Sequence, residues 1–187
     1  MSIELMLVLV AVVIVLVWVI ASFNGLVALR NRVQNAWSEI EVQLKRRHDV
    51  IPNLVESVRG YIQHERSIFE SVTQARAHAI TAGNNVVQRS LAETALSSAL
   101  GNFFAMVENY PQLRATENVQ LLQEQLTSTE NRIAFARQFY NDEVMKFNTM
   151  RSTFPRNLFA AAFGFSPAVM FTGTDTDRAN VQVEGLG

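Results

Sequence analysis

An uninterrupted apolar run near the N-terminus constrains this chain more than any other feature. The run extends from Leu5 to Ala21 and reads LMLVLVAVVIVLVWVIA. A helix over residues 3–23 would rise about 30 Å, which matches the hydrocarbon core of a bilayer. Trp18 lies near the C-terminal end of the run, where aromatic rings favour the headgroup level. We therefore predict a transmembrane anchor over residues 1–23.

A cleaved signal peptide is the alternative interpretation of this run. The tripeptide Val19-Ile20-Ala21 resembles a small-x-small cleavage site. A signal peptide, however, has a basic leading region and a shorter apolar stretch, and no Lys or Arg precedes Leu5. These differences favour a retained anchor.

Basic residues flank only one end of the apolar run. Arg30 and Arg32 follow it, whereas Glu4 precedes it. Because positively charged flanks stay on the cytoplasmic side, we expect the N-terminus outside and the large C-terminal part in the cytoplasm.

The composition favours long helices and excludes a broad basic surface. Lys and Arg number 16, Asp and Glu 17, and the net charge is −1. We therefore expect no nucleic-acid partner. Only 4 prolines and 8 glycines occur, most of them at expected joints or in the tail, as is typical of an all-α chain.

Apolar residues recur at three- and four-residue steps through most of the remaining chain, which predicts amphipathic helices. The expected helices cover residues 26–44, 49–82, 86–109 and 116–154. Short joints between them favour an antiparallel up-and-down bundle over residues 24–153. A C-terminal tail over residues 154–187, first apolar and then polar, completes the predicted fold.

The joint near residues 45–52 allows two interpretations. Asp49 can cap a new helix with Pro52 in its first turn, so that the chain reverses there and the bundle has four helices. Alternatively, Pro52 kinks one continuous helix and the bundle has three. We favour the reversal.

The first part of the tail at residues 154–187 is too apolar to lie free in water. Arg156 is the only charged residue of the stretch FPRNLFAAAFGFSPAVMF, which begins at residue 154. We expect this stretch to enter the lipid interface, cover the bundle or pack on a neighbouring subunit. Residues 172–187 look extended, and Val181-Gln182-Val183 alternates like a short strand. The candidate membrane or self-association residues are Phe154, Leu158, Phe159, Phe163, Phe165 and Phe171.

Catalytic and metal-binding patterns are missing from the sequence. His64-Glu65 begins like a zinc-binding HExxH motif, but position 68 is Ile, so a second ligand is absent. His48 and His78 are interpreted as surface or partly buried residues. No phosphate-binding or nucleophile-elbow motif occurs. We predict no catalytic residue, cofactor or metal, and hence no enzyme.

A basic cluster at residues 45–47 is the other polar feature of note. It lies about 24 helical residues, or roughly 36 Å, beyond Phe23, so an upright helix keeps it away from the headgroups. It is interpreted either as an ion-pair and capping network with Glu41 and Asp49 or as a contact site for a partner protein. The candidate partner-contact residues are Lys45, Arg46, Arg47, Asp49, Pro52 and Asn53.

Several strings along the chain resemble the LemA family. They include the run from Phe23 to Val27, the string RRHDVIPNLV at residues 46–55, Tyr110-Pro111-Gln112-Leu113, and the run from Thr129 to Ala134. The resemblance spans almost the whole chain. It implies a bacterial inner-membrane protein with one N-terminal transmembrane helix, a cytoplasmic helical bundle, no established enzymatic activity and no cofactor.

Two functions remain open after this search. The first is a membrane-anchored structural protein that associates with copies of itself, because confinement to a membrane raises effective concentration. The second is an adaptor or regulator of another envelope protein, such as a membrane protease, channel or sensor. The expected partners are the lipid bilayer, further copies of the chain and, in the second case, that other membrane protein.

Overall fold

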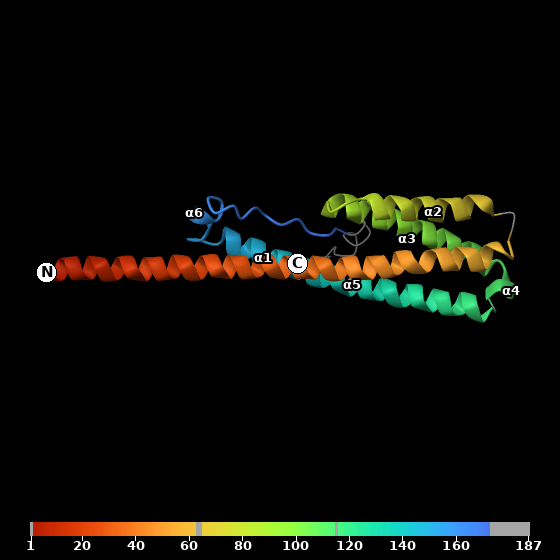
Figure 1. Ribbon diagram of the computed structural model, residues 1–187, viewed down its shortest axis with the longest axis horizontal. Coiled ribbons are helices and arrows are strands. Elements are labelled where there is room, and N and C mark those ends of the chain that lie inside the picture. Colours follow the sequence, from red (N-terminus) through yellow and green to blue (C-terminus); the bar gives the residue numbers. More distant parts are fainter. Residues whose placement is uncertain (1, 63–64, 115, 173–187) are drawn as a thin grey trace, which may run out of the picture. The chain divides into compact units, whose positions relative to one another are not determined.

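The computed structural model describes residues 2–62, 65–114 and 116–172, and this described part is helical without strands. The predicted all-α class is therefore confirmed for it. The predicted strand-like segment at residues 181–183 and His64 lie outside the described residues. In chain order the helices are α1 (Ile3–Arg59), α2 (Arg66–Thr81), α3 (Val86–Glu108), α4 (Pro111–Arg114), α5 (Glu117–Ser152) and α6 (Asn157–Ala160) (Figure 1).

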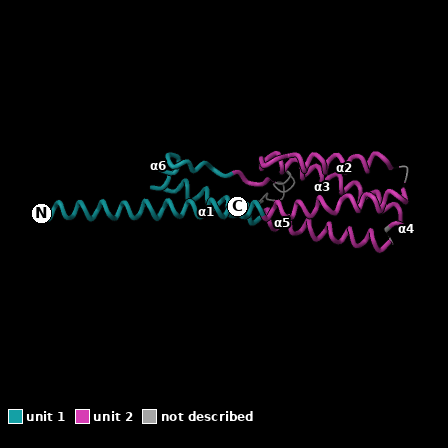
Figure 2. The backbone as a smooth tube through the Cα atoms, in the orientation of Figure 1, with its two compact units in different colours: residues 1–38, 138–168 teal, residues 39–137, 169–187 magenta. Residues whose placement is uncertain are grey.

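The chain divides into two compact units, which Figure 2 distinguishes by colour. Unit 1 comprises residues 1–38 and 138–168, and unit 2 comprises residues 39–137 and 169–187. Helices α1 and α5 each contribute to both units.

The predicted anchor is the N-terminal part of α1, which belongs to unit 1. Side chains from Ile3 to Val17 are exposed, and α1 is long and apolar enough to cross a membrane by its length and composition. Unpartnered aliphatic side chains over this many residues suit lipid rather than water. Burial within the chain begins only near Ser22 and Leu26, which are 2% and 0% exposed.

Beyond the anchor, α1 packs against α5 within unit 1. Trp37 faces Tyr140 with ring centroids 5.6 Å apart. Burial raises the pKa of the Tyr140 phenol above its ordinary value of 10.0, because removal from water disfavours the phenolate. At Gly25 a Cβ would lie 2.6 Å from Met150 Cε, so this glycine permits close packing at the level of that flexible side chain.

Unit 2 has one hydrophobic core that α1, α2, α3 and α5 share. Phe103 is fully buried at its centre and meets Phe69 of α2 edge to face, with ring centroids 6.0 Å apart. Other residues buried in this core include Ile51, Leu54, Val58, Val72, Leu96, Leu100, Val107, Val119 and Leu126.

The expected reversal at residues 45–52 is wrong. Helix α1 continues through this region to Arg59, with Pro52 inside it. The structure instead interrupts the helix between Arg59 and Arg66, where Gly60 and Tyr61 form a turn. The polar run at residues 45–49 predicts a break in the helix, but Arg47 and His48 are buried and hold polar contacts inside unit 2. Burial of Ile51 and Leu54 further along keeps the helix in the core.

The later joints lie close to their expected positions. Gly83 has φ +67°, a left-handed conformation that suits glycine at the end of α2. Asn85 then caps α3, since its Oδ1 accepts hydrogen bonds from the backbone N–H groups of Val87 and Gln88. Helix α5 begins at Glu117 and ends at Ser152, before Pro155.

Candidate functional site

The predicted partner-contact residues all lie on the part of α1 that belongs to unit 2, but they face different surroundings. The side chain of Arg47 is 3% exposed and points into the unit. The remaining candidates are exposed and form the outer side of the helix: Lys45, Arg46, Asp49, Pro52 and Asn53.

Arg47 belongs to a buried polar cluster that joins three helices. Its guanidinium donates to Ser97 Oγ at 2.7 Å and lies 3.8 Å from Glu93 Oε2, both on α3. It also lies 3.2 Å from Glu130 Oε2 on α5. The ion pairs of Arg47 therefore connect α1 with α3 and α5, rather than with the nearby Glu41 or Asp49 as one interpretation expected.

His48 completes the cluster from the neighbouring position of α1. Its Nε2 lies 2.9 Å from Glu93 Oε1, and both side chains are buried. The burial of His48 exceeds the surface or partly buried position expected from sequence, whereas His78 is exposed.

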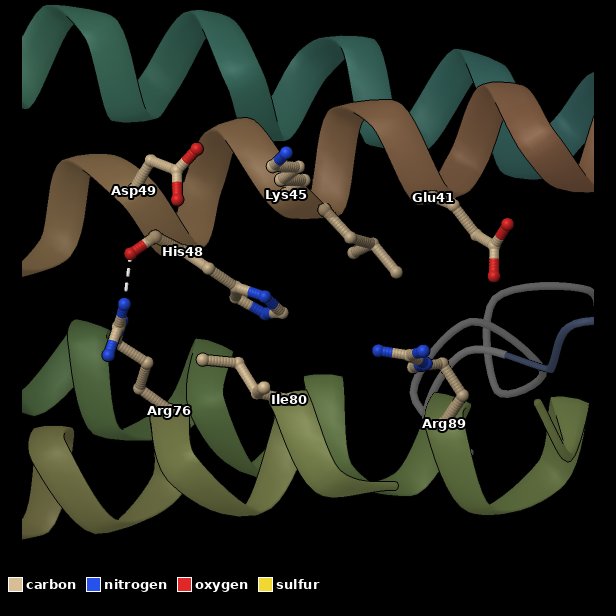
Figure 3. Close-up of a pocket in the computed structure, with 8 residues that line it drawn as sticks. Glu41, Lys45, His48, Asp49, Arg76, Ile80 and Arg89 are labelled. Carbon is tan, nitrogen blue, oxygen red and sulfur yellow. Dashed lines mark hydrogen bonds between the residues drawn. The ribbon is translucent and has the colours of Figure 1, made fainter. Parts of the chain in front are cut away.

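Pro52 leaves one backbone carbonyl, a helical turn earlier, without its usual hydrogen-bond donor. Proline has no backbone N–H, so the His48 carbonyl, four residues before it, loses its intrahelical donor. Arg76 of α2 supplies the replacement: its Nε donates to the His48 oxygen at 2.7 Å (Figure 3). The proline and the arginine thus form a structural pair across α1 and α2, and the pair explains how α1 accommodates Pro52.

Beside this pair, a groove of about 310 Å³ lies among α1, α2 and α3. Figure 3 shows the His48 side chain of α1 extending toward Arg76 and Ile80 of α2. The other lining residues are Glu41, Leu44, Lys45, Asp49 and Arg89.

The charged groups of the groove differ in how far they are already engaged. The Arg89 guanidinium donates to the Gly83 and Ala79 carbonyls at 3.1 Å each, so it caps the end of α2. The Arg76 Nε donates a hydrogen bond to the His48 carbonyl oxygen. Lys45 is exposed, and Glu41 and Asp49 line the same groove. This mixed rim suits a protein side chain of either charge better than a strongly anionic ligand.

A bound metal ion needs several ligand side chains directed at one point. Within residues 2–62, 65–114 and 116–172, no group of three His, Cys, Asp or Glu residues is positioned to hold a metal ion. The titratable side chains of the cluster are paired with one another, and His48 also lines the groove.

The tail residues also separate by environment. Phe165 and Phe171 are each 2% exposed and pack inside unit 1 and unit 2 respectively. Phe165 meets Phe23 and Phe147, while the Arg137 guanidinium lies 4.8 Å from the Phe171 ring centroid. The remaining candidates of the tail are exposed or half-buried: Phe154, Leu158, Phe159 and Phe163.

Sequence reasoning missed Arg76, Glu93 and Ser97. A signal for Arg76 was present, because a proline within an amphipathic helix leaves the carbonyl four residues earlier in need of a donor. Glu93 gives a weaker signal: it is an acidic residue that faces the same side of α3 as the apolar Leu96 and Leu100.

Fold and site together define a class: an all-α protein whose first helix could span a membrane and whose helices are joined by a buried polar cluster. The profile of the LemA family matches residues 36–184. The chain belongs to the LemA family.

Similar proteins extend this comparison at low identity. The chain is 25% identical over 174 residues to magnetosome protein MamQ 2 of Paramagnetospirillum magneticum. The aligned region covers 80% of this chain and 64% of that protein. It is 24% identical over 163 residues to protein LemA of Metamycoplasma hominis, with coverage of 87% and 74%. The chain thus spans less than two thirds of the length of the magnetosome relative.

Proposed function

We propose that this protein is a membrane-anchored, non-enzymatic structural protein whose copies associate with one another at the bacterial inner membrane. The observation that carries the proposal is the continuity of α1, which joins an exposed apolar segment to the core of a helical unit without a break. Anchoring confines copies to a plane, so modest contacts between them suffice for assembly.

The arrangement of the bundle that we propose is antiparallel and up-and-down. Two contacts between α1 and α2 support it. The Arg59 guanidinium lies 5.9 Å from the Phe69 ring centroid near the joint, and the His48 carbonyl meets Arg76 further away. The earlier residue of α1, His48, thus contacts the later residue of α2, Arg76, as in an antiparallel pair of helices.

One face of α5 favours self-association. Phe135 is 73% exposed and Phe139 is 53% exposed, one helical turn apart. Leu121 is 51% exposed and lies on the same face, because the 18 residues from Leu121 to Phe139 complete five turns. Large apolar side chains aligned outside the anchor are typical of contact surfaces.

The chain contains no cysteine, so single-cysteine crosslinking tests this surface directly. In membranes, Phe135→Cys and Phe139→Cys should each give a crosslinked dimer with a short bismaleimide. Ala134→Cys, which is exposed and lies about 100° around α5 from Phe135 and about 140° from Phe139, is the matched control and should give much less. Light scattering of the detergent-solubilised wild-type chain checks the same point, and a monomer at micromolar concentration would contradict the proposal.

The groove of Figure 3 supports a second candidate function, that of an adaptor or regulator of another envelope protein. Lys45, Asp49 and Asn53 are exposed on successive turns of α1 and offer polar contacts to a partner. A photoreactive group at position 45 or 53 separates the two functions. Adducts with a different protein favour the adaptor, whereas adducts between copies favour the structural protein.

A further inference from the structure

The segment around α6 in unit 1 combines exposed apolar side chains with a fixed attachment to the anchor helix. Phe154 is 74% exposed, Leu158 is 71% exposed and Phe163 is 51% exposed. Arg156 is the only charged residue between residues 152 and 172. Such a segment needs an apolar environment on its outer side.

Ring contacts determine where this segment lies along α1. Phe159 meets Trp18 edge to face, with ring centroids 5.9 Å apart. Phe163 meets Phe23 with ring centroids 5.4 Å apart, and Phe159 and Phe163 meet edge to face with centroids 5.8 Å apart. Figure 2 shows α6 next to α1 within unit 1. The segment therefore lies beside the C-terminal end of the apolar run, not beside the water-facing part of α1.

Contacts that follow α6 hold the segment in this position. The Arg151 Nε donates to the Phe165 carbonyl at 2.6 Å. The Asn148 side chain both donates to the Ala168 carbonyl and accepts from its N–H, at 2.9 Å each. The Arg30 guanidinium lies 5.5 Å from the Phe165 ring centroid. These contacts tie residues 165–168 to α5 and α1, while the N-terminal end of the segment continues directly from α5.

We propose that residues 154–163 form a second membrane-contacting element, which inserts Phe154, Leu158 and Phe163 into the bilayer interface beside α1. This inference rests on the proposed anchoring of α1. Trp18 lies three residues inside the end of the apolar run, a depth of about 5 Å for an upright helix, and interfacial segments bury their apolar side by about 5–10 Å. Arg156 then lies where a cation meets lipid phosphates.

Depth-dependent quenching in liposomes tests this proposal on the full chain. Leu158→Cys and, separately, Phe154→Cys are labelled with an environment-sensitive fluorophore and reconstituted with spin-labelled lipids. Ile14→Cys, which is 63% exposed within the apolar run, reports the anchor, and Gln123→Cys on α5 reports the background. Because the replaced side chains are exposed, these substitutions should leave the fold intact.

We expect the labels at positions 158 and 154 to show a blue shift and a loss of fluorescence to spin-labelled lipid well above that at position 123. Quenching at position 14 without quenching at 158 and 154 would overturn the proposal and leave the anchor intact. A blue shift at 158 without lipid quenching would place the segment against protein and also overturn it. No quenching at position 14 would overturn the proposed anchoring, and this inference with it.

Discussion

At the residue scale, Pro52 and Arg76 both act on the His48 carbonyl, because Pro52 removes its helical donor and Arg76 replaces it. Their coupling can be measured. Arg76→Met removes the donor to the His48 carbonyl at 2.7 Å, which leaves a partly buried acceptor unsatisfied. We expect a loss of about 1–3 kcal/mol in the free energy of unfolding. Urea unfolding of the detergent-solubilised chain, followed by circular dichroism, measures it.

A double-mutant cycle separates this bond from a general effect of Arg76. In Pro52→Ala, the new N–H of residue 52 can donate to the His48 carbonyl, so Arg76→Met should cost less in that background. Arg66→Met, at an arginine on α2 whose side chain is 87% exposed, is the control and should cost under about 1 kcal/mol. Equal costs of Arg76→Met in both backgrounds would show that the carbonyl does not depend on Arg76.

The buried polar cluster gives a second prediction at this scale. Glu93→Ala leaves Arg47 and His48 buried without their shared acceptor, and we expect a loss of about 3–5 kcal/mol. Glu130→Ala removes the other carboxylate at Arg47, but that side chain is 49% exposed, so its loss should be about 0–1 kcal/mol. The same urea assay compares them, and similar losses for both variants would argue against a cluster centred on Glu93.

At the scale of elements, the joint between α2 and α3 depends on local residues alone. Asn85→Ala removes the oxygen that accepts from Val87 and Gln88 N–H, and should cost about 1 kcal/mol. Asn85→Asp keeps that acceptor and should stay near the wild type. Thermal unfolding followed by circular dichroism distinguishes the two, and a neutral Asn85→Ala would show that the cap contributes nothing.

Comparison of the two joints explains which elements the sequence could predict. The joint at residues 83–85 was predictable because Gly83 and Asn85 act through their own backbone conformation and side chain. The end of α1 was not, because Pro52 normally ends or distorts a helix and its tolerance depends on Arg76, distant in sequence. The polar cluster was not predictable for the same reason, because the shared partner of Arg47 and His48 is Glu93, which is distant in sequence.

At the scale of the whole molecule, the placement of charge around α1 predicts how the chain crosses the membrane. Arg30 and Arg32 follow the apolar run and Glu4 precedes it, so the N-terminus should face outward and the helices of unit 2 the cytoplasm. With no native cysteine to interfere, a membrane-impermeant maleimide can test this on single-cysteine variants. Ser2→Cys should react in cells whose inner membrane is intact, whereas Gln123→Cys should react only after lysis.

Reversal of the flanking charge tests whether the two arginines cause this orientation. Arg30→Glu combined with Arg32→Glu removes the positive flank, so a larger fraction of Gln123→Cys should react in intact cells. An unchanged pattern would mean that another feature, such as early folding of unit 2 in the cytoplasm, sets the orientation. Reaction of Gln123→Cys in intact cells without the charge change would contradict the cytoplasmic placement. It would also oppose the structural role proposed at the inner side of that membrane, because the α5 face that carries Phe135 and Phe139 would then lie outside.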